Sequence, residues 1–245
     1  MAPKKLLLCA VSLTLVIAVS PAVAGDGRII QKSPLDHATL YQDSISRNVP
    51  VRVHPFSTEE ADLGSGAKRN KPKYRQIAED MKENSPQLLL TSLTANLKER
   101  GFADVDQVDS DQPMPEECLV IEGEFTLLNP GSKAKRYWAG FGAGKSQVCA
   151  TGRVINAKGD LLLEFDHCRH EAMGMFGGES KGQMAKDTHA TGVHLAEFME
   201  KWADGIYADQ TTDREQIGGL HGKRILEPIQ PLWNAGLDFA PPSPQ

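Results

Sequence analysis

The segment spanning residues 139–146 carries the residues most suggestive of chemistry. Its small residues end in Gly144, Lys145 and Ser146 and satisfy a relaxed phosphate-loop pattern. In a phosphate loop, backbone N–H groups at the start of a helix wrap the phosphates, and a buried strand leads into the loop. Here residues 131–138 are basic and aromatic, and residues 147–155 have the β-branched content of a strand. We therefore interpret the segment as a glycine-rich connection between two strands and not as a nucleotide site.

The same connection supports a second interpretation, an adaptable binding loop. It places cationic side chains beside aromatic rings, and both kinds of side chain contribute heavily to binding interfaces. Such a patch suits an acidic protein surface or a lipid headgroup. The candidate binding residues are Lys133, Lys135, Arg136, Tyr137, Trp138, Phe141 and Lys145.

Three residues of types that commonly bind metals lie close together in the sequence, namely His167, Cys168 and His170. Alternation along a strand places Cys168 and His170 on one face and His167 on the other. Further ligands would have to come from His189 or His194, which are five residues apart and do not share a helix face. We therefore predict no metal site and no cofactor.

Hydrolytic catalysis has no better support. Ser146 and several carboxylates are present, but no spacing of a nucleophile and a base stands out. Glu122 and Glu124 alternate along one strand, as expected for a solvated sheet face. We assign no catalytic residues. A deep pocket with converging histidines and acids would favour an enzyme, whereas an exposed sheet edge beside residues 133–146 would favour an interaction protein.

Two helices are expected to position these segments. The helical part begins near Tyr74. Within it, Ser85 and Pro86 give a start signal, with Ser85 as N-cap and Pro86 as first helical residue, and Gly101 ends the helix. A second helix begins near Ser180 and stops near Gly205. Its buried face is predicted from residues at helical spacing, namely Met184, Thr188, Thr191, Leu195, Phe198, Trp202 and Ile206.

Strand patterns fill the remaining sequence. Residues 49–56 alternate between apolar and polar, and their two prolines favour the ends of a strand or a sheet edge. Further strands are expected at residues 102–108, 118–128, 146–155 and 160–169. This order of elements predicts an α+β two-layer domain, with a mostly antiparallel sheet and two main helices packed on one face.

The hairpin between the last two strands has two possible registers. A two-residue loop at 158–159 opposes Arg153 to Glu164, which is a favourable charge pair. A three-residue loop at 157–159, with glycine as a bulge, opposes Arg153 to Leu163. Turn statistics slightly favour the longer loop, whereas side-chain agreement favours the shorter one.

The shorter loop also opposes Cys149 to Cys168, whereas the longer one opposes Cys149 to His167. We predict a cross-strand disulfide between Cys149 and Cys168, with two reduced thiols as the alternative. Cys118, at the start of a core strand, is predicted to be a buried thiol and not a nucleophile.

The first 24 residues have the pattern of a secretory signal peptide. Lys4 and Lys5 precede an uncharged apolar run at residues 6–19, and Ala22-Val23-Ala24 fits a cleavage site before residue 25. The run is too short for a membrane anchor. Cys9 lacks the preceding small residue that lipidation needs. We expect an exported protein, periplasmic or secreted and not lipid-anchored.

The remaining chain is divided by composition into an N-terminal arm or short extra strand at 25–48, an α+β domain at 49–207 and a mostly irregular, Pro-rich tail at 208–245. Trp233 and Phe239 could dock the tail. Residues 25–245 hold 25 basic and 32 acidic side chains, a net charge of −7. This balance argues against nucleic acid or anionic lipid as the main partner.

Three parts of the chain carry a family resemblance, namely residues 129–146, the segment Thr151-Gly152-Arg153-Val154 and the closing helix. In these parts the chain resembles an uncharacterised bacterial envelope family, domain of unknown function 4410. The resemblance is specific within 118–205, weaker over 49–117 and absent from the tail. Many members look like lipoproteins, and this chain departs from them at Cys9. The resemblance implies an envelope location and no catalytic residues. Our leading hypothesis is a non-enzymatic interaction or assembly module for an envelope protein or lipid headgroup; the alternative is a periplasmic small-molecule or metal-binding protein or enzyme.

Overall fold

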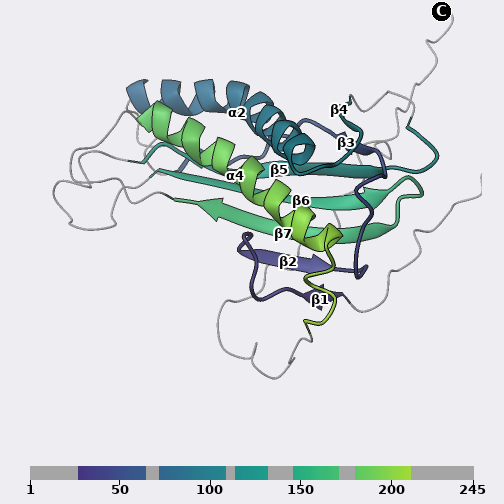
Figure 1. Ribbon diagram of the computed structural model, residues 1–245. Coiled ribbons are helices and arrows are strands. Elements are labelled where there is room, and N and C mark those ends of the chain that lie inside the picture. The colour runs from purple at the N-terminus through teal and green to yellow at the C-terminus, as the bar shows by residue number, and fades with distance from the viewer. Residues whose placement is uncertain (1–26, 65–71, 109–113, 132–145, 171–179, 211–245) are drawn as a thin grey trace, which may run out of the picture.

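The computed structural model describes residues 27–64, 72–108, 114–131, 146–170 and 180–210. Two long helices of the described chain, α2 (Pro72–Glu99) and α4 (Ser180–Ala203), cover one face of a seven-stranded sheet (Figure 1). The strands are β1 (Arg28–Ile29), β2 (His37–Leu40), β3 (Val51–Val53), β4 (Val105–Gln107), β5 (Leu119–Asn129), β6 (Gln147–Asn156) and β7 (Leu161–Arg169).

The strand order is β1-β2-β7-β6-β5-β3-β4. Only the pairings of β3 with β4 and β5 are parallel among these strands, so the sheet is mostly antiparallel. The predicted α+β two-layer architecture is confirmed. Residues 28–40, expected as an arm or extra strand, contribute β1 and β2 to the same sheet.

Helix α2 runs without a break through Ser85 and Pro86, so the predicted start signal at these residues is wrong. A proline inside a helix has no N–H for the carbonyl four residues earlier, here that of Lys82. The hydroxyl of Thr58 donates a hydrogen bond to this carbonyl at 3.1 Å and supplies the missing donor. A residue outside the helix therefore lets α2 continue past its proline.

Both helices end as predicted, at glycines with a positive φ. In α2, Gly101 has φ 85°, and the N–H groups of Gly101 and Phe102 donate to the carbonyls of Lys98 and Leu97. Gly205 closes α4 in the same way, with φ 71°. This pattern is the Schellman motif, which requires a left-handed residue that glycine provides without steric cost.

The buried face of α4 follows the predicted helical spacing from Met184 to Trp202, and each predicted side chain in that span is buried. The exception is Ile206, whose side chain is 54% exposed, so its predicted place on the buried face is wrong. The helical spacing no longer applies there, because Gly205 turns the chain before residue 206. Trp202 donates its indole N–H to the carbonyl of Gln42 and ties α4 to the segment after β2.

The two helices approach closely at Gly192 of α4 and Ser92 of α2. A Cβ atom on Gly192 would lie 2.8 Å from Oγ of Ser92 and 2.9 Å from the backbone N of Leu93. The Ser92 hydroxyl donates to the carbonyl of His189 at 2.8 Å. Glycine is therefore needed at this position for the helices to pack at their present separation.

The hairpin of β6 and β7 uses both of the expected registers. At the turn, Asn156 N–H donates to Asp160 O and Gly159 has φ 85°, as in a three-residue loop. A bulge between Val154 and Ile155 then shifts the register, and from Val154 onward the pairing is that of the two-residue loop. The two alternatives were not exclusive, because a bulge can connect them.

None of the helices in the described ranges combines the length and apolar character needed to span a bilayer. Residues 1–24, Trp233 and Phe239 lie outside the described residues.

Candidate functional site

The predicted binding residues, Lys133, Lys135, Arg136, Tyr137, Trp138, Phe141 and Lys145, lie outside the described residues. The structure does describe the residues on either side of them. β5 and β6 lie in the middle of the sheet, flanked by β3 and β7. The connection therefore leaves the end of two central strands, and the exposed sheet edge beside residues 133–146 that would favour an interaction protein is not found among the described strands. The strand that follows Ser146, expected from its composition, is confirmed as β6.

Both described ends of this connection are well held. On the β5 side, the side-chain oxygen of Asn129 accepts the N–H of Gly131 at 2.9 Å, and Gly131 has φ 72°. On the β6 side, Ser146 is fully buried. This turn chemistry fixes the direction in which the chain leaves the sheet.

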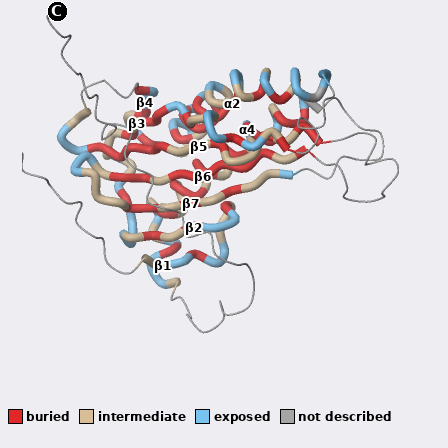
Figure 2. The backbone as a smooth tube through the Cα atoms, turned by 180° about the vertical axis from the view of Figure 1, so that it is seen from behind, coloured by how far each residue is buried: buried red, intermediate tan, exposed pale blue. Residues whose placement is uncertain are grey.

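The helix-free face of the sheet carries polar side chains in register across its central strands. They alternate with the core-facing residues of β5, β6 and β7, and the tube in Figure 2 shows buried and intermediate stretches along these strands. Nε of Arg153 donates to Glu122 at 2.6 Å, and both side chains are largely buried, 16% and 8% exposed. The predicted register of Arg153 opposite Glu164 is confirmed, and the guanidinium group pairs with Glu122 on β5, the strand on the other side of β6.

Glu164 accepts a hydrogen bond from the hydroxyl of Tyr41 at 2.7 Å. Burial of the phenol, together with this carboxylate, raises the pKa of Tyr41 to about 12. Tyr41 is therefore a fixed hydrogen-bond donor at neutral pH and not a proton acceptor. The polar row of Glu122, Arg153, Glu164 and Tyr41 is internally paired, as expected for a structural ladder.

Cys149 and Cys168 form a disulfide across β6 and β7, on this same helix-free face. The predicted pairing is therefore present in the structure. Disulfides persist in oxidising compartments such as the periplasm and are rare in the cytosol. Cys118 is a free buried cysteine, and burial raises the pKa of its thiol, which makes it a poor nucleophile.

A cluster of titratable groups lies on the opposite face, where α4 packs on β7. Nδ1 of His194 lies 3.0 Å from Nε2 of His167, and Nδ1 of His167 lies 3.2 Å from Oδ2 of Asp36. The second contact lacks hydrogen-bond alignment, so it is mainly electrostatic. The same Asp36 oxygen accepts the backbone N–H of Cys168 at 2.6 Å. Asp36 thus connects the histidine pair to the disulfide-bonded strand position.

Sequence reasoning did not find this cluster. Asp36 lies in the segment expected as an arm, and only the pairing of β2 with β7 brings it to His167. The signal that was available is the strand alternation that separates His167 from Cys168, and this part of the prediction is confirmed.

The predicted metal-ligand types do not converge in the structure. Cys168 is bonded to Cys149, while His170 and His189 are exposed. Among the residues that the structure describes, no group of three or more histidine, cysteine, aspartate or glutamate side chains is arranged to hold a metal ion.

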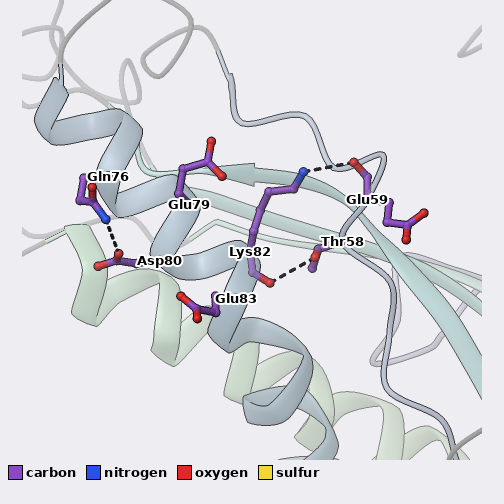
Figure 3. A pocket seen from close by; sticks show the side chains of 7 residues that line it. All are labelled: Thr58, Glu59, Gln76, Glu79, Asp80, Lys82 and Glu83. Carbon is purple, nitrogen blue, oxygen red and sulfur yellow. Dashed lines mark hydrogen bonds between the residues drawn. The ribbon is translucent and has the colours of Figure 1, made fainter.

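A hollow of about 440 Å³ lies beside the first half of α2 (Figure 3). Its polar groups bind one another: Lys82 donates to the carbonyl of Glu59 at 3.1 Å, and Gln76 donates to Asp80 at 2.8 Å. The lining residues are Thr58, Glu59, Gln76, Glu79, Asp80, Lys82 and Glu83. They include no histidine, so this hollow is not the pocket of converging histidines and acids that would favour an enzyme.

Comparison with solved structures finds distant neighbours. A PelC dodecamer from Paraburkholderia phytofirmans aligns with a TM-score of 0.37 and 14% identity, over 76% of this chain and 100% of the PelC chain. A variant of that dodecamer in another crystal form aligns with the same score and identity over 70% and 98% of the two chains. The crystal structure of an uncharacterised protein aligns with a TM-score of 0.32 and 14% identity, over 64% and 95%.

No curated protein matches the chain. The domain of unknown function DUF4410 matches residues 51–198. The match begins at β3, ends within α4 and includes both strands that flank the glycine-rich connection. Since it covers more than half of the chain, this protein belongs to the DUF4410 family.

Proposed function

We propose that this protein is exported to the cell envelope and acts there as a non-enzymatic interaction or assembly module. It binds an envelope protein or a lipid headgroup through the cationic and aromatic residues between Gly131 and Ser146. The disulfide between Cys149 and Cys168 is the observation that carries this proposal. It supports both the compartment and the presentation of the binding segment.

Redox chemistry supports the proposed compartment. A cytosolic thiol pool keeps most cysteine pairs reduced, whereas an exported protein can keep them oxidised. The charged and apolar pattern of residues 1–24 is the independent sequence feature that favours export.

The presentation of the binding segment follows from its attachment. β6, which receives the segment, pairs along its length with β5 and β7 and is covalently linked to β7 three residues after Ser146. Binding residues commonly lie on loops that a rigid scaffold holds in place. The sheet supplies such a scaffold at the two strands that flank residues 132–145.

Photo-crosslinking in the native host tests the binding surface. A photoreactive residue replaces Trp138 in the full chain, and a matched control replaces Ala95, which is exposed on α2. Position 138 is expected to capture one defined protein or lipid, identified by mass spectrometry, and position 95 is not. Charge reversal at Lys133, Lys135 and Arg136 should abolish the capture. No capture at position 138, or equal capture at both positions, would contradict the binding proposal.

Cell fractionation with N-terminal sequencing tests the compartment. The expected product is a soluble envelope-fraction protein that begins at residue 25. A full-length chain in the cytosolic fraction, with free thiols at Cys149 and Cys168, would overturn the export proposal while leaving the crosslinking result to be judged separately.

A further inference from the structure

The histidine pair joins three separate parts of the chain. His194 belongs to α4, His167 belongs to β7, and Asp36 precedes β2. His167 is only 3% exposed, and its ring centroid lies 5.0 Å from that of His194. The contact lies between the helical layer and the sheet, where α4 meets β7.

The number of protons in the contact between His167 and His194 limits how many positive charges the pair can hold. A neutral imidazole carries one N–H, and a carboxylate only accepts. If His167 carries its proton on Nδ1, on the side of Asp36, and His194 carries its proton on Nδ1, toward Nε2 of His167, the contact between the rings contains one proton and both rings are neutral. We assign these tautomers to the neutral state of the pair.

One extra proton also fits. If His167 becomes charged, its Nε2–H can donate to His194, provided that the proton of His194 moves to its other nitrogen. The backbone of Pro34 favours the charged form of His194, and Asp36 favours the charged form of His167. A second extra proton places an N–H on both facing nitrogens, so two donors and two positive charges meet at 3.0 Å.

We propose that the contact between His167 and His194 is a proton-controlled latch, which holds α4 on β7 while at most one ring is charged and releases it when both rings are charged. The stimulus is mild acid. The moving element is α4.

Burial and one nearby cation favour neutral rings in the closed state, against the effect of two carboxylates. Burial is the main cause that lowers the pKa of both rings, for His167 to about 4, and Arg169 at the end of β7 lowers both further. Asp36, from the segment before β2, opposes the shift for both rings, and Glu197 on α4 opposes it for His194. The closed latch therefore resists protonation, whereas rings released to water titrate near the ordinary value of 6.5.

Acid shifts the equilibrium between the closed and the open state toward the open state. Between pH 6.5 and about 4, the open state binds protons that the closed state does not, so acid favours opening. His167 alone raises the opening constant about twentyfold between pH 7 and pH 5. Titration of His194 in the open state adds to this factor.

Hydrogen exchange at pH 7 and pH 5 tests the latch, with each rate expressed as a protection factor relative to the unstructured chain at the same pH. In the full chain, amides of α4 around His194 and the amide of Cys168 should lose at least tenfold in protection at pH 5. Amides at 88–97 of α2 should lose less than threefold, which separates the latch from global unfolding.

Two variants make the test specific. The double variant His167→Gln and His194→Gln keeps polar groups at both positions but cannot charge, so its protection should change less than threefold between the two pH values. His189→Gln, on the exposed side of α4, should behave as the wild type. An equal pH response in the double variant and the wild type would overturn the latch.

An NMR titration of the wild-type histidines covers the case in which the double variant does not fold. The latch requires His167 and His194 to titrate together and below pH 6. Independent titration of both rings near 6.5 would overturn it.

Discussion

The hydroxyl of Thr58 donates a hydrogen bond at 3.1 Å to the main-chain carbonyl of Lys82, which Pro86 leaves without its helical donor. This relationship explains why α2 continues through a residue that normally ends or kinks a helix. The hydrogen bond also anchors the segment after β3 to the helical layer, next to the hollow of Figure 3.

Replacing Thr58 with valine is expected to lower the free energy of unfolding by about 1–2 kcal/mol, because it leaves a main-chain carbonyl without a donor. The measurement is urea denaturation followed by circular dichroism. Pro86→Ala supplies an N–H to the Lys82 carbonyl from within the helix. In the Pro86→Ala background, Thr58→Val should therefore cost less than half as much. Equal costs in the two backgrounds would show that Thr58 does not act through this carbonyl.

The disulfide should contribute strongly to stability. It closes a loop with a sequence separation of 19, for which the chain-entropy estimate is about 3 kcal/mol. Cys149→Ser with Cys168→Ser is expected to lower the unfolding free energy by about that amount, measured by denaturation without reductant. Intact mass should rise by about two daltons on reduction of the wild type and stay constant in the double variant, since two hydrogens are added per disulfide.

Cys118→Ala serves as the matched control for this experiment. It removes the remaining thiol of residues 25–245 and leaves the disulfide intact, so the mass shift on reduction should persist. Loss of the shift in this variant would mean that Cys118 takes part in the bond.

The ion pair on the helix-free face gives a comparison within one strand. Glu122→Gln removes the carboxylate from the largely buried Arg153, and hydrogen bonds to charged groups contribute about 1.5–3 kcal/mol. Glu124 lies two residues along β5 on the same face and is partly exposed. We expect Glu124→Gln to change stability by less than about 0.5 kcal/mol. Similar effects of the two substitutions in denaturation would contradict a special role for the pair.

Local signals in the sequence were sufficient for the ends of both helices and for the main strands, since each acts within a few residues. Gly101 and Gly205 end their helices for conformational reasons that need no tertiary partner. The pairing of Cys149 with Cys168 followed from one hairpin. In each case the deciding contact is close in sequence.

Contacts between distant segments were not predictable in this way. Thr58 lets α2 run through the start signal predicted at Pro86, through a hydrogen bond across 24 residues, and Asp36 reaches Cys168 across 132 residues. The candidate latch depends on β2 pairing with β7, which no local pattern specifies. The candidate binding segment was found from residue types alone, and the structure adds the central strands on either side of it.

Two glycines of α4 provide the last prediction, because they have opposite surroundings in one helix. Gly192→Ala places a methyl group 2.8 Å from Oγ of Ser92 and 2.9 Å from a backbone nitrogen of α2, so the helices must move apart. Overpacking of this kind costs about 1–3 kcal/mol. Gly182→Ala meets no atom within 4 Å. Because alanine favours the helix over glycine, it should raise stability by about 0.5–1 kcal/mol.

Thermal unfolding of both variants tests this contrast. We expect the midpoint to fall for Gly192→Ala and to rise for Gly182→Ala. Ser92→Ala should rescue Gly192→Ala only in part, since the backbone contact with Leu93 remains. If both glycine substitutions raised the midpoint, the close approach of α2 and α4 at Ser92 would be wrong, and the helices would have to pack farther apart than the structure places them.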